Sequence, residues 1–222
     1  MSQPRTIPRS RMRGFLNLLL FLVLLLLLLV LVVVFLAGLR PAFYVNHSQR
    51  DRDNLARDAY AFNQKTQDFL SAVWSERRLP LDLTEGEVNG YLAAVNDQAI
   101  WEQLPLKFEG WRKIFTSDWL RDVQVSFRSG RVTVAGEVTW RGFDVVLSVF
   151  GLPRVDQEGK VTLHVDGVRA GALPIPRIFV RDLLESIQDR PIPAAVGRWH
   201  LVSVTVHDGK ATLLGEPGPR KD

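Results

Sequence analysis

The pattern of apolar and polar positions changes twice along the chain, and each part predicts a different kind of element. Residues 15–39 form an apolar run without a charge, in which Asn17 is the one clearly polar side chain. From residue 53 the apolar positions recur at helical spacing, and from about residue 119 they alternate with polar ones at strand spacing. This order predicts a long apolar helix followed by an α+β domain.

The apolar run is long enough to cross a bilayer. At about 1.5 Å per residue it spans roughly 37 Å, whereas a hydrocarbon core is about 30 Å thick. A cleaved signal peptide is the alternative, but its apolar stretch is about 7–15 residues long and ends at a small-residue cleavage site. The run here leads into Leu39-Arg40-Pro41, so we predict one uncleaved transmembrane helix at 15–39.

Basic residues flank this helix unevenly. Four arginines precede it with no acid among them, whereas arginines and aspartates are mixed in the segment that follows. The positive-inside rule therefore predicts a basic cytoplasmic tail at 1–14 and an extracytoplasmic or periplasmic domain, anchored in the cell (inner) membrane. Without these four arginines the chain has 24 basic and 24 acidic residues, so the domain is close to neutral. We expect the lipid bilayer as a partner and no nucleic acid.

Two amphipathic helices are predicted after a linker at 40–54. The first covers about 53–76 and either packs on the domain or lies on the bilayer surface, of which packing is favoured. The second covers 85–96, where Thr84 and Glu87 have the spacing of a capping box. The domain is expected to extend over 55–216, followed by a frayed tail at 217–222.

Two short turns set the predicted strand pairing. Ser129-Gly130 and Arg141-Gly142 each suit a two-residue hairpin turn, and both place the apolar side chains on one side of the sheet. The predicted pairs are Phe127–Val132, Val125–Val134, Trp140–Phe143, Val138–Val145 and Val134–Val149.

The remaining pattern completes an antiparallel sheet. A fourth strand at 160–168 follows a loose loop at 151–159, and a last hairpin turns at Asp208-Gly209. Pro176 is placed to open a third helix, whose apolar face we expect to consist of Ile178, Phe179, Leu183, Leu184 and Ile187. In the last hairpin we expect Val206 opposite Ala211 and Val204 opposite Leu213. The fold class is thus α+β, with a curved antiparallel sheet of about six strands covered by two to three helices.

Few residues indicate catalysis. The chain has no cysteine, which excludes disulfides, thiolate metal sites and a cysteine nucleophile. Its four histidines have no metal-ligand spacing, and no nucleotide-binding or hydrolase motif is present. We predict a protein that is not an enzyme and has neither a catalytic residue, a metal nor a cofactor. A hydrolase acting on envelope polymers is the alternative, and it needs a polar cleft built from residues far apart in sequence.

The order of several short motifs resembles a known family. The motifs are residues 83–92, 134–138 and 159–165 and, most specifically, Gly171-Ala-Leu-Pro-Ile-Pro before a helix. Together they look like the YpmS-type bacterial membrane proteins, which have an N-terminal anchor and an extracytoplasmic domain of unknown role. More distantly, a curved sheet around a helix is similar to the tubular lipid-binding superfamily typified by YceB lipoproteins. The resemblance implies a binding module for an apolar ligand, although fold alone does not determine function.

The resulting hypothesis is a membrane-anchored, non-catalytic domain that binds a lipid or another apolar envelope ligand on its apolar sheet face. The alternative is a structural or protein-interaction module of a cell-envelope assembly, in which the same side chains are core. A cluster of aromatic residues near 101–119 is likewise either core packing or a rim near lipid headgroups. The candidate ligand-binding residues are Val125, Phe127, Val134, Val138, Trp140, Leu147 and Val149.

Overall fold

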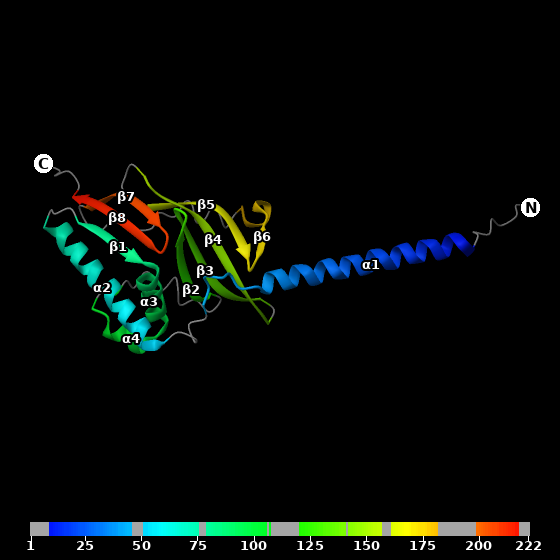
Figure 1. Cartoon of the computed structure of the whole chain (residues 1–222), viewed down its shortest axis with the longest axis horizontal. Helices are drawn as coiled ribbons and strands as arrows, with labels where there is room; N and C mark the ends of the chain where they lie inside the picture. The colour runs from blue at the N-terminus through cyan, green and yellow to red at the C-terminus, as the bar shows by residue number, and fades with distance from the viewer. Residues whose placement is uncertain are drawn as a thin grey trace, which may run out of the picture.

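The computed structural model of the chain describes residues 9–45, 51–75, 79–105, 107, 120–140, 142–156, 161–181 and 199–217. A long helix leads into a domain of mixed helices and strands (Figure 1). The helices are α1 (Arg9–Gly38), α2 (Arg52–Trp74), α3 (Glu85–Asn96) and α4 (Gln98–Gln103). The strands are β1 (Pro80–Thr84), β2 (Arg121–Arg128), β3 (Arg131–Trp140), β4 (Phe143–Val155), β5 (Val161–Ala170), β6 (Leu173–Ile175), β7 (Trp199–His207) and β8 (Lys210–Pro217).

The strands form two antiparallel sheets, and the α+β class predicted from the sequence is confirmed. One sheet has five strands in the order β2-β3-β4-β5-β6, and the other has three in the order β1-β8-β7. The terminal hairpin therefore pairs with β1 and forms a sheet of its own. The short strand β1 was not expected, because its apolar residues Leu81 and Leu83 lie directly before a helix cap.

The hairpin registers predicted from the turns are confirmed. Phe127 lies opposite Val132, Val134 opposite Val149, and Trp140 opposite Phe143. The terminal hairpin also has the expected register, in which Val206 faces Ala211 and Val204 faces Leu213. Shifting any of these pairings by one residue would turn its apolar side chains to the opposite face of the sheet.

The prediction of a loop at 151–159 is wrong for residues 151–155, because β4 continues to Val155. A bulge between Phe150 and Gly151 interrupts the alternation that marks the strand in the sequence. Pro153 is accommodated because β3 pairs with β4 only as far as Gly151, which leaves one side of β4 free of a ladder.

The main core lies between the helices and the three-stranded sheet, at the end of the domain away from α1 (Figure 1). The helix predicted at 53–76 packs on the domain, since Phe62 of α2 stacks on Tyr91 of α3 with ring centroids 4.5 Å apart. Trp101 is 2% exposed and belongs to this core, whereas the other aromatic residues of its predicted cluster lie outside the described residues. Leu81, Leu83 and Leu201 supply the apolar face of the small sheet.

A helix begins after Pro176, as expected, and is described as far as residue 181. Its Val180 packs on Val165 and Val168 of the large sheet. Ile178 and Phe179, which we expected on the covered face, are 80% and 78% exposed. The other residues predicted for this helix, Leu183, Leu184 and Ile187, lie outside the described residues.

The capping box predicted at the start of α3 is present. The Thr84 hydroxyl accepts a hydrogen bond from the Glu87 amide at 3.2 Å, and the Glu87 carboxylate accepts one from the Thr84 amide at 2.9 Å. Lys65 of α2 also pairs with Glu87 at 2.7 Å, which ties α2 to the helix start. Burial by itself raises the pKa of the Glu87 carboxyl, but the bonds from Lys65 and Thr84 outweigh it, and the net pKa is lowered.

Replacing Glu87 by glutamine tests this cap. A carboxyl whose pKa is lowered by folding stabilises the fold above its ordinary pKa of 4.5, and the stabilisation is lost as the pH falls below that value. We expect E87Q to unfold at a lower temperature than the wild type at neutral pH and to lose less stability on acidification. Circular dichroism of the full chain in detergent, recorded from about pH 7 to pH 3, measures both effects.

The matched control is E102Q, which neutralises an exposed glutamate on α4. If E87Q loses as much stability on acidification as the wild type and E102Q do, the role given to Glu87 is contradicted.

Candidate functional site: an apolar groove beside helix α1

The apolar face of the large sheet, which carries Val125, Phe127, Val134, Val138, Leu147 and Val149, is divided between core and groove. Phe127 is buried against Val206 and Ala211 of the terminal hairpin, and Val125 packs on the same cluster. Val149 packs on the cluster formed by Val165 and Val168, while Val134 is half-buried between Val125 and Val149.

Two of the predicted residues, Val138 and Leu147, line a groove at the end of this face nearest α1. The groove has a volume of about 580 Å³, which falls in the range of about 300–1,000 Å³ typical of ligand sites. Its lining is almost wholly apolar, and one wall is the last two turns of α1. The lining residues are Val33, Val34, Ala37, Gly38, Val138, Phe143, Asp144, Val145, Leu147 and Ala170. Trp140 pairs with Phe143 through its backbone, and its side chain lies outside the described part of the chain.

The wall formed by α1 belongs to the helix that can span a membrane. The most apolar stretch of 18 residues within Leu19–Gly38 has a mean hydropathy of 3.8, and none of it is buried by the domain. Because Val33 and Val34 lie within this stretch, the groove opens at the level where the apolar helix ends and the domain begins.

The groove exists because a tight turn fixes the domain to the end of α1. The Ala172 amide donates to the Leu36 carbonyl at 2.9 Å, and the Gly171 amide donates to the Val146 carbonyl at 2.8 Å. The last carbonyls of a helix have no partner within the helix. The Leu36 carbonyl accepts a hydrogen bond from the Leu39 amide at 3.3 Å, and the turn at residues 171–172 adds a shorter one while it positions β4 and β5 beside α1.

Gly171 allows this contact for two reasons. Its φ is +57°, and a Cβ at this position would lie 2.4 Å from the Ala37 carbonyl oxygen and 2.5 Å from that of Leu39. Beyond it, Leu173-Pro-Ile175 forms the edge strand β6, where a proline needs no ladder partner. The Gly-x-Leu-Pro-Ile-Pro motif thus combines a close backbone approach, an edge strand and a helix start.

The segment after α1 is bound to the opposite face of the same sheet, here called the polar face, which carries Gln124, Ser126, Thr133, Ser148 and Arg169. The Val45 amide donates to the Gln124 side chain at 3.0 Å, and the Gln124 amide group donates back to the Val45 carbonyl. The Tyr44 hydroxyl donates to the Asp122 carbonyl at 3.0 Å. Burial, and then the nearby Asp122 carboxylate, raises the pKa of Tyr44 well above its ordinary value.

Asp144 is the one charged residue in the described lining of the groove, and its charge is compensated at the rim. Its carboxylate accepts a hydrogen bond from the Thr139 hydroxyl at 2.7 Å and pairs with Arg121 at 3.2 Å. The interior of the groove therefore offers van der Waals contact to an apolar group and little that would polarise a reacting bond.

Potential metal-ligating side chains are not clustered within the described residues. No group of three histidine, aspartate or glutamate side chains within those ranges is arranged to hold a metal ion. His164 and His207 lie on strands and are exposed.

Comparisons with family models, curated proteins and solved structures found no match. The residues themselves therefore carry the functional argument.

The sequence did not reveal the helix wall of the groove. Nothing in the pattern connects Val33, Val34 and Ala37 with the strands at 138–147, because that contact depends on the turn at residues 171–172. The signal available was Gly171, since a glycine between two strands can indicate a close backbone approach.

Replacing Gly171 by alanine should detach the turn from α1. The added Cβ would force apart backbone atoms that cannot yield as side chains do, and we expect the Ala172–Leu36 hydrogen bond to be lost. Hydrogen–deuterium exchange of the full chain in nanodiscs should show exchange at Ala172 faster by about tenfold, which corresponds to about 1.4 kcal/mol.

Gly130→Ala is the matched control, because Gly130 also has a positive φ of +76° but has open space where a Cβ would be. Equal effects of the two substitutions on exchange at Ala172 would show that backbone strain, rather than contact with α1, is responsible.

Proposed function

We propose that this chain is a single-pass membrane protein whose domain lies outside the cytoplasm and holds an acyl chain of an envelope lipid in the apolar groove. The observation that carries the proposal is the composition of the groove wall. One side is the end of an apolar helix of membrane-spanning length, and the other is the apolar face of the sheet. A lipid chain lying alongside α1 in the bilayer would reach the groove without crossing water.

Exposed apolar side chains on the domain favour contact with the membrane. Phe143 lines the groove and is 65% exposed, and Ile178 and Phe179 follow β6, which, like β4 and β5, contacts α1. Aromatic side chains in this position suit the boundary between lipid and water. As part of the same proposal we place the chain with the YpmS-type bacterial proteins and assign it a binding role rather than a catalytic one.

Photo-crosslinking tests the groove. The full chain is reconstituted in phosphatidylcholine vesicles in which a fraction of the lipid carries a diazirine near the end of its acyl chain. We expect labelling of α1 and, in addition, of the β3 and β4 segments around Val138 and Leu147. In Leu147→Gln, label on β4 should fall about tenfold while label on α1 persists as an internal reference, because an amide in an apolar site costs about 1–3 kcal/mol.

Val202→Gln provides the control, since Val202 is 43% exposed on β7 and is not part of the groove. Labelling confined to α1 in the wild type would overturn the lipid-binding proposal and favour a protein-interaction role for the domain.

The proposed orientation is tested separately with cysteine labelling. Because the chain has no cysteine, Ser2→Cys and Ser129→Cys each introduce a single thiol into the full chain. In intact cells an impermeant maleimide should label the thiol at position 129, and it should label the one at position 2 only after lysis. The reverse pattern would refute the orientation.

A further inference from the structure

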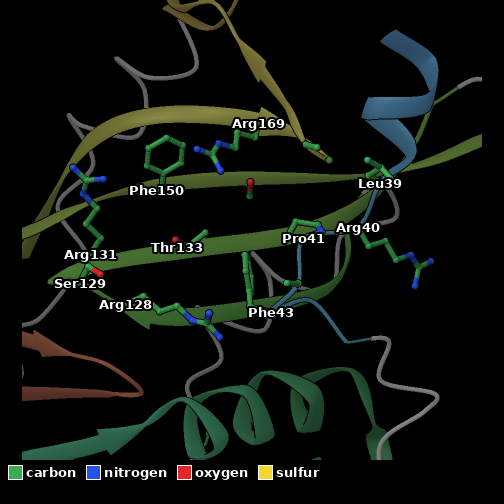
Figure 2. Close-up of a pocket in the computed structure, with 14 residues that line it drawn as sticks. Leu39, Arg40, Pro41, Phe43, Arg128, Ser129, Arg131, Thr133, Phe150 and Arg169 are labelled. Atoms are coloured by element: carbon green, nitrogen blue, oxygen red, sulfur yellow. The ribbon is translucent and has the colours of Figure 1, made fainter. Parts of the chain in front are cut away.

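A second pocket lies on the polar face of the large sheet. It has a volume of about 600 Å³, and one wall is the segment 39–43 that leaves α1. Three arginines, Arg128, Arg131 and Arg169, line it, together with the ring of Phe150 (Figure 2). Arg40 is also at the wall, but it pairs with Glu137 at 3.5 Å. No carboxylate belongs to the lining within the described ranges.

Two of these arginines repel each other, and a bound anion would reduce this repulsion. Arg128 and Arg131 lie directly opposite each other across the β2–β3 hairpin, and like charges in such a cross-strand pair are destabilising. Asp166 pairs with Arg131 at 3.2 Å, whereas Arg128 has no carboxylate partner among the residues that the structure describes. The pair therefore carries net positive charge that is available to a ligand.

Arg169 is held in place by an aromatic platform. Its guanidinium lies 5.0 Å from the centroid of the Phe150 ring, in the geometry of a cation–π contact. Phe150 in turn lies over Gly167, where a Cβ would approach the ring to 2.8 Å, so the glycine leaves the space that the ring occupies. Figure 2 shows Arg131 and Arg169 on opposite sides of this ring, which separates the cationic groups into two positions.

The floor of the pocket supplies hydroxyl groups. Ser148, opposite Arg169, and Thr133, opposite Phe150, both line it, and Ser148 is only 3% exposed. Hydroxyls beside guanidinium groups are typical donors to phosphate oxygens, and arginine binds phosphate through paired, charge-assisted hydrogen bonds.

The short distance between this pocket and the end of α1 points to a membrane lipid as the source of the anion. Arg169 precedes Gly171, the residue in contact with the end of α1, by two strand positions, which is about 7 Å along β5. The headgroup layer of one leaflet is about 5–8 Å thick, so an arginine about 7 Å along the strand from the end of a membrane-spanning helix is within reach of lipid phosphates.

We propose that this pocket binds a membrane lipid whose headgroup carries two phosphate groups, one at Arg169 and the other at Arg128 and Arg131. This inference rests on the membrane anchoring of the proposed function but not on the apolar groove, which uses other residues on the opposite face of the sheet.

Native mass spectrometry of the full chain in detergent tests the proposal. The probes are cardiolipin with two phosphates, phosphatidylglycerol with one, and phosphatidylcholine without net charge. We expect retention in that order, and about tenfold less bound cardiolipin in Arg128→Gln and in Arg169→Gln, the loss expected for one charge-assisted contact. Arg154→Gln on β4, outside the pocket, should retain cardiolipin as the wild type does.

Equal retention of cardiolipin and phosphatidylglycerol would overturn the two-phosphate assignment, and unchanged retention in both arginine variants would overturn the site. Displacement of cardiolipin by an equal concentration of inorganic pyrophosphate would show that a free diphosphate, and not a lipid, is the ligand. Leu147→Gln should bind as much cardiolipin as the wild type. A negative result for acyl-chain binding in the groove can therefore be distinguished from a negative result for headgroup binding in this pocket.

Discussion

The contact between the end of α1 and the turn at Gly171 and Ala172 is the constraint on which the rest of the arrangement depends. The last carbonyls of a helix have no partner within the helix, and here the Leu36 carbonyl accepts, in addition to a hydrogen bond from the Leu39 amide at 3.3 Å, one from the Ala172 amide at 2.9 Å. Because Gly171 has no side chain, the backbones approach closely enough for this bond to form. The domain is therefore attached to its helix by folded structure as well as by the chain itself.

That attachment gives the two faces of the large sheet different environments. On the apolar face, the terminal hairpin covers Phe127, and the part near α1 remains a groove with Val138 and Leu147 in its wall. On the polar face, the segment after α1 is bound through Val45 by the side chain of Gln124, and its residues 39–43 form one side of the arginine-lined pocket. Both sites thus border the same few residues at the end of the helix.

Backbone hydrogen bonds join the two sheets at a corner that positions the covered half of the apolar face. The Gly209 amide donates to the Phe127 carbonyl at 2.8 Å, and the Glu85 amide donates to the Gly209 carbonyl at 3.0 Å. The Glu85 carboxylate accepts from Ser126 at 2.9 Å. The start of α3, the terminal hairpin and the end of β2 are consequently held together, and the sheet can close at this corner while it stays open toward α1.

The sequence by itself determined the features whose physics is local. Helical periodicity and the Thr84–Glu87 spacing marked α3 from its first to its last residue, and two-residue turns set the strand registers, because each depends on neighbours in the chain. Tertiary structure alone decided that β1 would join the terminal hairpin, that β4 would continue past its bulge, and which valines would be core or groove wall. Those outcomes depend on contacts between different segments, some of them more than 100 residues apart, as Ala37 is from Gly171. The hydrophobic alternation of a strand specifies a buried face without specifying what covers it.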